Sequence, residues 1–591
     1  ALQYQTPFLK IKYVKGLREN DQKLFEKWNA YSRVAVFPFT KTKDNQFFEW
    51  GLDSMLVQDP PPQLFMNIDA GAATPITKFT NDLKPLEILR YGLPSLAYNL
   101  RTAPQTLIIG PGGGNDVLRA LIFGSESIDA VEYNPLIYQA VNQVFGDFSG
   151  HIYDHPKVHF HLSEGRHFVQ RTNRTYDIIQ ASLVDTFAAS SAGALTLSES
   201  TLYTVEAFTD YLDHLKPAGI LTISRFIHDP PWETLRIASI AREAFRRRGI
   251  SDFSRHIIIY KLSKFSTTLI KKEAFTEAEI KEIMKIAQIL SFSPVWVPGH
   301  KQDTAIFRSL LLDHDVEKFY RDYSLDVTPT TDDSPFFFFV GKLKNLLQKS
   351  SFRHQNIFHY QAIYILVVLL VIAWILILAF ILLPLLIRGR ELAITFSVIK
   401  KPLLYFLGIG VGYMTIEVGI IQRFLLPLGH PIYALSVVLF TMLVFSALGS
   451  ACSFRFGQQR KYQWILFALI VTLLVPIILL HGTINDLLIG QTLWSRILLT
   501  VVILAPLSFL MGMPFPRGIR LFFSRNPSLI PWAWAINGAS SVLASIGALF
   551  VAMISNYSVV LWLGAGFYCL AMLAVSGIFR QDLRPSGQEN E

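Results

Sequence analysis

Cysteine is nearly absent from this 591-residue sequence: the chain has two, Cys452 and Cys569, and both lie inside apolar runs. Two isolated thiols can build neither a disulfide framework nor a cysteine-based zinc site. The adjacent acids Asp332 and Asp333 follow threonines, and such pairs more often form a turn or a helix cap than hold a metal ion. We therefore expect no metal site.

Charged side chains are missing from long stretches of the second half. Residues 360–387 contain none, and a helix needs about 20 apolar residues to cross the hydrocarbon core of a bilayer. Similar runs cover residues 402–421, where Glu417 is the one interruption, 431–454, 463–481, 497–516 and 526–579. The last run has room for two spans, broken near Ser555 and Asn556. The sequence predicts an all-α membrane domain of about seven transmembrane helices over residues 346–591, in contact with a lipid bilayer.

The net charge of +9 does not indicate a nucleic-acid partner, because many lysines and arginines flank the apolar runs and the first half shows no stripe of basic and aromatic residues. We expect no nucleic acid to bind. The sequence begins with Ala1 rather than methionine, and we expect an upstream segment to have been removed or left out.

The first half contains a strand, a glycine turn and a helix in succession. In residues 106–135 (TLIIGPGGGNDVLRALIFGSESIDAVEYNP) an apolar run ends in glycines and is followed by apolar residues at helical spacing. A second apolar run ends in Glu132, about 20 residues after the glycines. In a doubly wound α/β sheet such glycines admit a ligand, and such an acid accepts hydrogen bonds from ribose hydroxyls. The stretch predicts a site for an adenosine-containing cofactor; the alternative is a tight turn in a ligand-free α/β domain.

Further elements follow the same rhythm. We expect strands at residues 158–162, 176–181 and 220–224, and helices at residues 83–100, 135–145 and 205–215. Small or polar residues follow the strands, where a doubly wound sheet has its ligand crevice. Alternating apolar residues and turn signals before residue 100 indicate a β-rich subdomain (residues 1–100) ahead of a Rossmann-like domain (residues 101–345).

The order of the motifs GGG, VEYNP, SEGRHF, YDIIQASLVD, LYTVEAF and LKPAGILTISRF resembles the spermidine synthase-like branch of class I S-adenosylmethionine-dependent transferases. The stretches WNAYSRVAV and TTDDSPFFFF resemble the large bacterial membrane-anchored members of that branch. The resemblance covers roughly residues 25–340. It implies a seven-stranded methyltransferase-type sheet with an N-terminal β-domain, and S-adenosylmethionine or decarboxylated S-adenosylmethionine as the cofactor.

The resemblance also implies roles for single residues. The glycines would meet the methionine part of the cofactor, Glu132 its ribose, and Glu164 with Gly165 its adenine. The aspartate that the family has among the glycines is displaced here, and the nearest acid is Asp116. The cofactor-binding residues predicted in this way are Gly110, Gly112, Gly113, Gly114, Asp116, Glu132, Glu164 and Gly165.

One departure from the family concerns the reaction. In polyamine-making relatives the strand that reads YDIIQAS here ends in an aspartate that helps to deprotonate the attacking amine, and here that position is Ser182. A neutral hydroxyl cannot act as a base near pH 7, which argues against aminopropyl transfer to a simple diamine. Asp185 matches the second aspartate of that loop and is the remaining base or amine anchor; Tyr203 completes the catalytic candidates. Alternatively, Asp185 caps the following segment and Tyr203 packs in a helix.

Two arguments about orientation disagree. With seven alternating spans, basic residues gather in the loops after spans one, three and five, which by the positive-inside rule places the N-terminal domain outside the cytoplasm. Yet basic residues also precede span one, and adenosylmethionine is a cytosolic metabolite. We expect a multi-pass protein of the bacterial inner membrane with its N-terminal domain in the cytoplasm. A miscounted span, or a missing N-terminal membrane half such as large relatives carry, would reconcile the charges. Additional membrane segments or subunits are among the expected partners.

Three polar residues lie within or beside the apolar runs: Glu417, Arg423 and Asn537. A carboxylate at membrane depth costs a few kcal/mol unless it is paired or protonated. The residues predict either a polar pathway or membrane-embedded substrate site, or interhelical hydrogen bonds between closely packed helices.

Two functions are compatible with the whole pattern. The first is a membrane-bound transferase that moves an aminopropyl or methyl group from the cofactor to a small-molecule or membrane-delivered acceptor. The second is a catalytically inactive nucleotide-fold scaffold or sensor in a transporter-like membrane protein or complex, which Ser182 favours.

Overall fold

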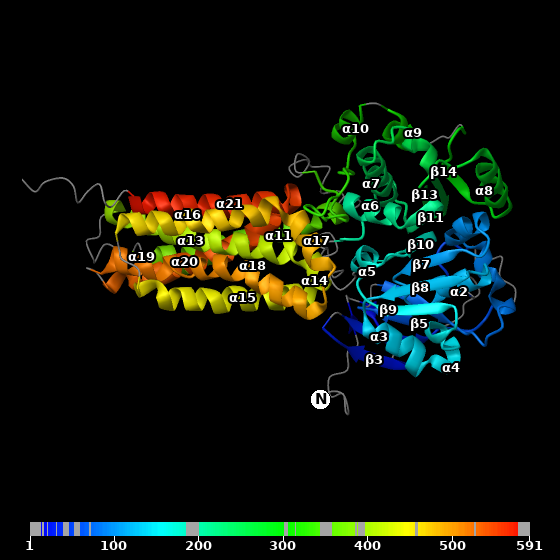
Figure 1. Ribbon diagram of the computed structural model, residues 1–591, viewed down its shortest axis with the longest axis horizontal. Coiled ribbons are helices and arrows are strands. Elements are labelled where there is room, and N and C mark those ends of the chain that lie inside the picture. Colours follow the sequence, from blue (N-terminus) through cyan, green and yellow to red (C-terminus); the bar gives the residue numbers. More distant parts are fainter. Residues whose placement is uncertain are drawn as a thin grey trace, which may run out of the picture. The chain divides into compact units, whose positions relative to one another are not determined.

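The computed structural model describes residues 13–14, 17–19, 22–30, 32–39, 47–52, 60–69, 72–184, 200–300, 305–313, 315–342, 357–384, 387, 396–455, 459–524 and 527–576. The chain divides into two compact units, Ala1–Ala362 and Ile363–Glu591 (Figure 1). The boundary predicted near residue 345 lies in a segment outside the described residues. Each unit is described by itself.

A small antiparallel sheet occupies the start of the first unit. Its strands pair in chain order: β3 (Phe25–Trp28), β4 (Arg33–Pro38), β5 (Gln63–Ile68) and β6 (Ala72–Thr77). Two short strands ahead of it, β1 (Tyr13–Val14) and β2 (Leu17–Arg18), form a pair of their own. This sheet confirms the β-rich start that the alternating pattern predicts.

A larger sheet forms the centre of the unit, in the order β14-β12-β13-β11-β10-β7-β8-β9. Five neighbouring strands, β11, β10, β7, β8 and β9, run parallel, and the order reverses between β7 and β10. The bounds are β7 (Gln105–Ile109), β8 (Ser127–Glu132), β9 (Val158–Leu162), β10 (Tyr176–Ser182), β11 (Leu215–Phe226), β12 (Ile257–Leu262), β13 (Phe265–Lys271) and β14 (Ser293–Trp296). The doubly wound fold is thus confirmed.

The sheet has eight strands where the resemblance implied seven. The additional strand, β14, pairs antiparallel with β12 at the edge. It has four residues, and its first two are exposed, so the sequence offers too short an apolar run to indicate a strand.

Two apolar layers cover the sheet, because successive residues of a strand point to opposite faces. Ile108 and Ile178 belong to the layer that holds η2, η3, α2, α3 and α8, whereas Leu107 and Ile179 belong to the layer of α5, α6, α7, α9 and α10. The helical elements are η2 (Lys84–Tyr91), η3 (Leu93–Leu100), α2 (Asn115–Ile122), α3 (Pro135–Tyr138), η4 (Gln139–Val144), α4 (Gly146–Ser149), η5 (Ile152–Asp154), α5 (Gly165–Arg171), α6 (Val205–Asp213), α7 (Glu233–Arg247), η8 (Phe253–His256), α8 (Glu277–Ile289), α9 (Ala305–Leu312) and α10 (Val316–Asp322).

The helical segment predicted at residues 83–100 is confirmed, but it is not one continuous α-helix. The segment forms two 3-10 helices, η2 and η3, separated by Gly92 in an extended conformation. Pro94 has no N–H to donate to the carbonyl of Arg90, so a continuous α-helix across Gly92 would lose a hydrogen bond.

The phenylalanine-rich segment after residue 330 is held by a buried arginine. Arg236 of α7 is 2% exposed, and its Nη1 donates to the carbonyl oxygens of Phe337 and Phe339 at 2.6 Å each. Its Nη2 donates to the carbonyl oxygen of Asp326 at 2.7 Å. One side chain therefore satisfies the backbone of an irregular segment whose phenyl rings fill the core.

The second unit is all helical, and its long helices run alongside one another as a bundle (Figure 1). Its elements are α11 (Ile357–Ile377), η11 (Leu378–Leu382), α13 (Phe396–Arg423), α14 (Leu425–Leu428), α15 (Pro431–Cys452), η12 (Ser453–Arg455), α16 (Arg460–Leu479), α17 (His481–Ile489), α18 (Leu493–Met511), α19 (Pro514–Phe523), η13 (Pro527–Leu529), α20 (Ile530–Ile554) and α21 (Tyr557–Ser576). Within the described residues, seven helical segments are long and apolar enough to cross a membrane, as predicted. The predicted break near Ser555 and Asn556 separates α20 from α21.

Helices α15 and α18 approach each other closely through two glycines. A Cβ atom at Gly449 would collide with the carbonyl oxygen of Phe509, and one at Gly512 with that of Ser446. Small residues at such crossings allow close backbone packing, which is how apolar helices associate in a membrane.

Candidate functional site

The glycine turn joins β7 to α2 at the point where the strand order reverses. Gly110 and Gly112 have φ angles of 68° and 56°, and Gly114 caps α2 with φ 99°, a region that side chains rarely enter. Gly113 is needed for another reason. Its N–H donates to Thr74 Oγ1 at 2.9 Å, and a Cβ there would collide with the carbonyl of Pro75. Strand β6 of the small sheet thus lies against the turn, and a cofactor contact of these glycines stays a prediction.

Glu132 ends β8, the strand next to β7, and is 4% exposed. Its Oε1 accepts hydrogen bonds from the N–H groups of Tyr133 at 2.9 Å and Asn134 at 3.0 Å. Burial raises the pKa of this carboxyl from 4.5 to about 7, although the N–H groups of Asn134, Gly112 and Tyr133 act in the other direction. A carboxylate has roughly four acceptor positions, so these three donors leave capacity for a hydroxyl group. The predicted ribose-binding role of Glu132 stays a prediction.

Asn134 has a role that the sequence reasoning missed. Its Oδ1 accepts from the N–H of Leu136 at 3.1 Å, which caps α3, and from Asn29 Nδ2 at 2.8 Å. Its Nδ2 donates to Ser32 Oγ at 2.7 Å. Asn134 followed by Pro135 was the available signal for a helix start. The contacts of Asn134 with Asn29 and Ser32 join residues more than a hundred positions apart, so no local pattern indicates them.

Asp116 lies in a buried ion cluster in the first turn of α2. It pairs with Arg119, which also pairs with Glu49 and donates to Ser95 Oγ at 2.9 Å. Asn115 Nδ2 donates to the other carboxylate oxygen of Glu49 at 2.5 Å. The cluster accounts for the position of Asp116 by itself, and its predicted cofactor contact stays a prediction.

Glu164 and Gly165 begin α5 at the carboxyl end of β9. Glu164 is the helix cap, and its two carboxylate oxygens accept from the N–H groups of Arg166 at 3.1 Å and His167 at 2.7 Å. Burial raises the pKa of Glu164. Gly165 allows α5 to approach β7, because a Cβ there would press against Ile109. The adenine contact implied for this pair stays a prediction.

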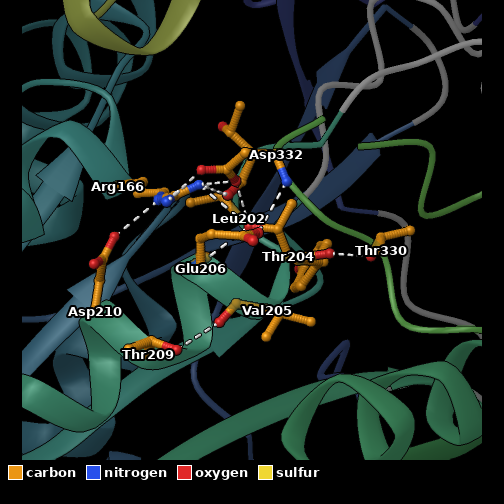
Figure 2. A network of polar contacts seen from close by, with 12 residues as sticks. Arg166, Leu202, Thr204, Val205, Glu206, Thr209, Asp210, Thr330 and Asp332 are labelled. Atoms are coloured by element: carbon orange, nitrogen blue, oxygen red, sulfur yellow. Dashed lines mark hydrogen bonds and ion pairs between the residues drawn. The ribbon is translucent and has the colours of Figure 1, made fainter. Parts of the chain in front are cut away.

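Arg166 connects α5 with two segments far along the chain (Figure 2). It is 2% exposed, its Nε donates to Asp210 Oδ2 at 3.0 Å, and its Nη2 donates to Asp332 Oδ2 at 2.8 Å. Thr204, the cap of α6, donates to Asp332 Oδ1 at 2.7 Å. Figure 2 shows these side chains converging between α6 and the segment around residue 332. This place of Asp332 agrees with the prediction that Asp332 and Asp333 form a turn or a helix cap.

Ser182 ends β10, the strand on the other side of β7. Its Oγ accepts from Gln180 Nε2 at 3.0 Å, and Gln180 Oε1 accepts from the hydroxyl of Tyr98 at 2.5 Å. Ser182 therefore continues a buried polar row along β10. Asp185, the other candidate at this end, lies outside the described residues.

Tyr203 is 1% exposed and packs its ring against Phe337, with 4.7 Å between ring centroids. Its hydroxyl donates to the carbonyl oxygen of Val184 at 2.8 Å and accepts from Arg225 Nη1 at 3.4 Å. Tyr203 thus fixes the backbone at the end of β10, next to the position of Asp185. Its predicted catalytic role stays untested.

The fold and these strand ends can be compared with known proteins. Residues 93–260 match the spermine/spermidine synthase domain. The matched part begins in η3, ends in β12 and contains every predicted cofactor-binding and catalytic residue. The resemblance that the motifs predicted is thereby confirmed for this spermidine synthase domain.

Solved structures similar to the chain include spermidine synthases. The enzyme from Thermotoga maritima is 17% identical with a TM-score of 0.29, covering 44% of this chain and 75% of that one. A probable spermidine synthase from Corynebacterium glutamicum is 14% identical with a TM-score of 0.28, covering 44% and 86%. A spermidine synthase in complex with the transition-state analogue AdoDATO is 17% identical with a TM-score of 0.28, covering 44% and 75%. Comparison with curated protein sequences gave no significant match.

The three predicted polar residues of the second unit lie on two helices, α13 and α20. Glu417 of α13 is 8% exposed, and no hydrogen bond or ion pair joins it to another residue in the part of the chain that the structure describes. Arg423 Nη2 donates to Ser558 Oγ of α21 at 2.5 Å. Asn537 lies on α20 beside Gly410, and its carbonyl oxygen accepts from the hydroxyls of the serines that follow it. A shared polar site of the three stays a prediction.

Proposed function

We propose that the first unit binds S-adenosylmethionine or its decarboxylated form at the carboxyl ends of β7, β8 and β9, and transfers an aminopropyl or methyl group to an acceptor. The observation that carries the proposal is Glu132, a buried carboxylate with remaining acceptor capacity at the end of β8, beside a turn of three glycines with positive φ. The match of residues 93–260 to the spermine/spermidine synthase domain supports the same cofactor.

The bound cofactor would supply an electrophilic carbon next to a positively charged sulfur. Glu132 would accept hydrogen bonds from the ribose hydroxyls. The glycine turn would bring backbone N–H groups close to the ligand, and the capped start of α5 at Glu164 would border the adenine. Thr74 of β6, bonded to Gly113, would keep the turn in place during binding.

The second unit would anchor the enzyme in a lipid bilayer through its seven apolar helices. We infer a place in the bacterial inner membrane with the first unit on the cytoplasmic side, where the cofactor is made. The acceptor would be a small molecule or a molecule delivered by the membrane, and further membrane segments or subunits would complete the assembly.

Calorimetry on the full chain in detergent tests the proposal. We expect binding of S-adenosylmethionine or its decarboxylated form, and loss of binding in Glu132→Ala. Glu126→Ala is the matched control, because Glu126 is an exposed acid just before the amino end of the same strand. Absence of heat with both cofactor forms would contradict the proposal, and so would equal loss of binding in the two variants.

A scaffold or sensor without catalysis is the second candidate, and the place of Ser182 favours it. The residue that stands where polyamine-making relatives have a base is a neutral hydroxyl bonded to Gln180. This candidate predicts cofactor binding without transfer. Isotope from labelled cofactor that reaches an acceptor in cells, and does so only when Asp185 is intact, would rule it out.

A further inference from the structure

A histidine and a glutamate form a pair just beyond the end of β11. His228 follows the strand by two residues, and Glu233 is the first residue of α7. His228 Nε2 lies 2.9 Å from Glu233 Oε1, and the imidazole stacks on Trp232 with 4.9 Å between centroids and 11° between planes. The pair is therefore held from two sides, by a hydrogen bond and by an aromatic face.

The partners of Glu233 decide which ring nitrogen carries the proton. Burial acts to raise the pKa of Glu233, but the Arg225 guanidinium and His228 outweigh it and hold that pKa below its ordinary value. Arg225 Nε donates to Glu233 Oε2 at 2.7 Å. An ionised carboxylate can only accept hydrogen bonds, so His228 Nε2 must donate. The neutral ring then has its lone pair on Nδ1.

The imidazole of His228 is partly open to solvent. The side chain is 43% exposed, and no hydrogen bond joins Nδ1 to a residue that the structure describes. A histidine with one nitrogen bound to a carboxylate and the other open to solvent is the arrangement that general bases use, because its basic form exists near pH 7.

The pair lies at the same edge of the sheet as the cofactor residues. Strands β10 and β11 are parallel neighbours, with Ser182 opposite Ser224, so their carboxyl ends meet at one edge. From Glu233, contacts lead through Arg225 to the Tyr203 hydroxyl and on to the Val184 carbonyl at the end of β10. The segment between β4 and β5 borders this edge as well, since Trp50 packs edge-on against Phe226 with 5.4 Å between centroids.

We propose that His228, oriented by Glu233, is the general base that accepts the proton of the acceptor in group transfer. The inference rests on the proposed transferase function and supplies the base that Ser182 cannot. The acceptor nitrogen forms a bond to the carbon next to the sulfonium, the carbon–sulfur bond breaks, and its electron pair stays on sulfur as a neutral thioether. The proton released from the nitrogen passes to Nδ1 and from there to water.

Activity should follow the charge of the imidazole. Of the charged groups around His228, Glu233 of α7 is bonded to it, Arg225 of β11 lies on the far side of Glu233, and Asp229 follows it in the chain. Only the neutral ring accepts a proton, so His228 acts as the base in its neutral form.

The test uses the full chain in detergent, with decarboxylated S-adenosylmethionine or S-adenosylmethionine as donor and a short alkyl diamine or a long-chain alkylamine as acceptor. The readout is release of the thioether product. We expect His228→Gln, which keeps a donor for Glu233, to lower the rate about a hundredfold. We expect cofactor affinity in calorimetry to remain unchanged, and imidazole to restore activity to His228→Ala.

His159→Gln is the matched control, because His159 is an exposed histidine near the amino end of β9. Equal rates in His228→Gln, His159→Gln and the unaltered chain would overturn the assignment while leaving the proposed function intact. Loss of cofactor binding in His228→Gln would also overturn it, since the residue would then support the fold. An unaltered chain that binds the cofactor without any transfer leaves no reaction for a base and overturns the assignment, whereas absence of binding overturns the proposed function itself.

Discussion

Four buried arginines of the first unit face carboxylates, whereas the hydrogen bonds described for three buried arginines of the second unit go to neutral oxygens. The first unit has Arg33 with Glu19 and Glu26, Arg119 with Glu49 and Asp116, Arg166 with Asp210 and Asp332, and Arg225 with Glu233. In the second unit, Arg423 donates to Ser558 Oγ, Arg496 to the carbonyl of Pro427 and Arg517 to Gln463 Oε1.

The difference follows from where acids are placed in the sequence. Between residues 396 and 576 the acids are Glu417 and Asp486, and neither forms an ion pair with a residue that the structure describes. A charge taken out of water must be compensated, and a folded domain in water does so with an opposite charge at a cost in desolvation. The hydrogen bonds described for the second unit go to a hydroxyl, a backbone carbonyl and an amide oxygen, which would suit helices in a membrane, where ionised groups are expensive.

The largest expected effect is loss of a partner from an ion cluster of the first unit. Arg166→Met leaves Asp210 and Asp332 without their common cation, and we expect destabilisation by about 3–5 kcal/mol. Hydrogen exchange of the full chain should show faster exchange in α5 and α6. Arg246→Met is the control, because Arg246 is an exposed arginine that pairs with Glu243 on the surface of α7. Unchanged protection in Arg166→Met would break the comparison for the first unit.

The second unit should instead be sensitive to side-chain volume at helix crossings. Gly449→Leu inserts a side chain where the backbone of Phe509 lies against α15, and we expect a loss of about 1–3 kcal/mol from overpacking. The melting temperature in detergent and exchange in α15 and α18 measure it. Gly547→Leu on α20 is the control, since a Cβ there meets no atom within 4 Å. Equal melting temperatures of the two variants would show that α15 and α18 do not approach as described.

A buried acid without an ion-pair partner should make cofactor binding depend on pH. The pKa of Glu132 is raised to about 7, so the carboxylate that accepts ribose hydroxyls forms as pH rises. We expect affinity for S-adenosylmethionine to increase about tenfold between about pH 6 and about pH 8, and to be weak and independent of pH in Glu132→Gln. Calorimetry across this range measures it. An affinity that falls with rising pH would contradict the assignment.

The sign for stability is opposite to that for binding. Because the folded-state pKa of Glu132 lies above its ordinary value of 4.5, the folded chain binds more protons than the unfolded chain between 4.5 and about 7. The contribution of Glu132 to stability is therefore present at low pH and is lost as pH rises through this window. Glu132→Gln should flatten that part of the stability profile.

The smallest effect is expected at Glu417. With no partner among the described residues, Glu417→Gln removes a desolvated charge without breaking a pair, and we expect stability to change by less than about 1 kcal/mol or to increase. Glu233→Gln is the contrast, because it takes the counter-charge from Arg225. The melting temperatures of Glu417→Gln and Glu233→Gln in detergent measure this difference. A loss in Glu417→Gln as large as that in Glu233→Gln would mean that Glu417 has a partner.

Much of the architecture was predictable because it is encoded in short stretches. Apolar runs between breaks gave the seven helices and the junction at Ser555, and the glycine turn between two apolar runs indicated β7, α2 and β8. The sequence did not distinguish the two 3-10 helices at residues 84–100 from an α-helix, because three- and four-residue periods overlap in short segments. It did not indicate the strand β14, which has only four residues.

The sequence by itself determined which residue types end each strand, because strand ends and helix starts follow local patterns of apolar, glycine and acidic residues. Only the tertiary structure decided what those residues touch. Gly113 turned out to face Pro75, Arg166 to reach Asp332 across more than 160 positions, and Arg236 to bind the carbonyl of Phe337. Such contacts depend on packing between distant segments, and no local spacing in a single sequence carries that information.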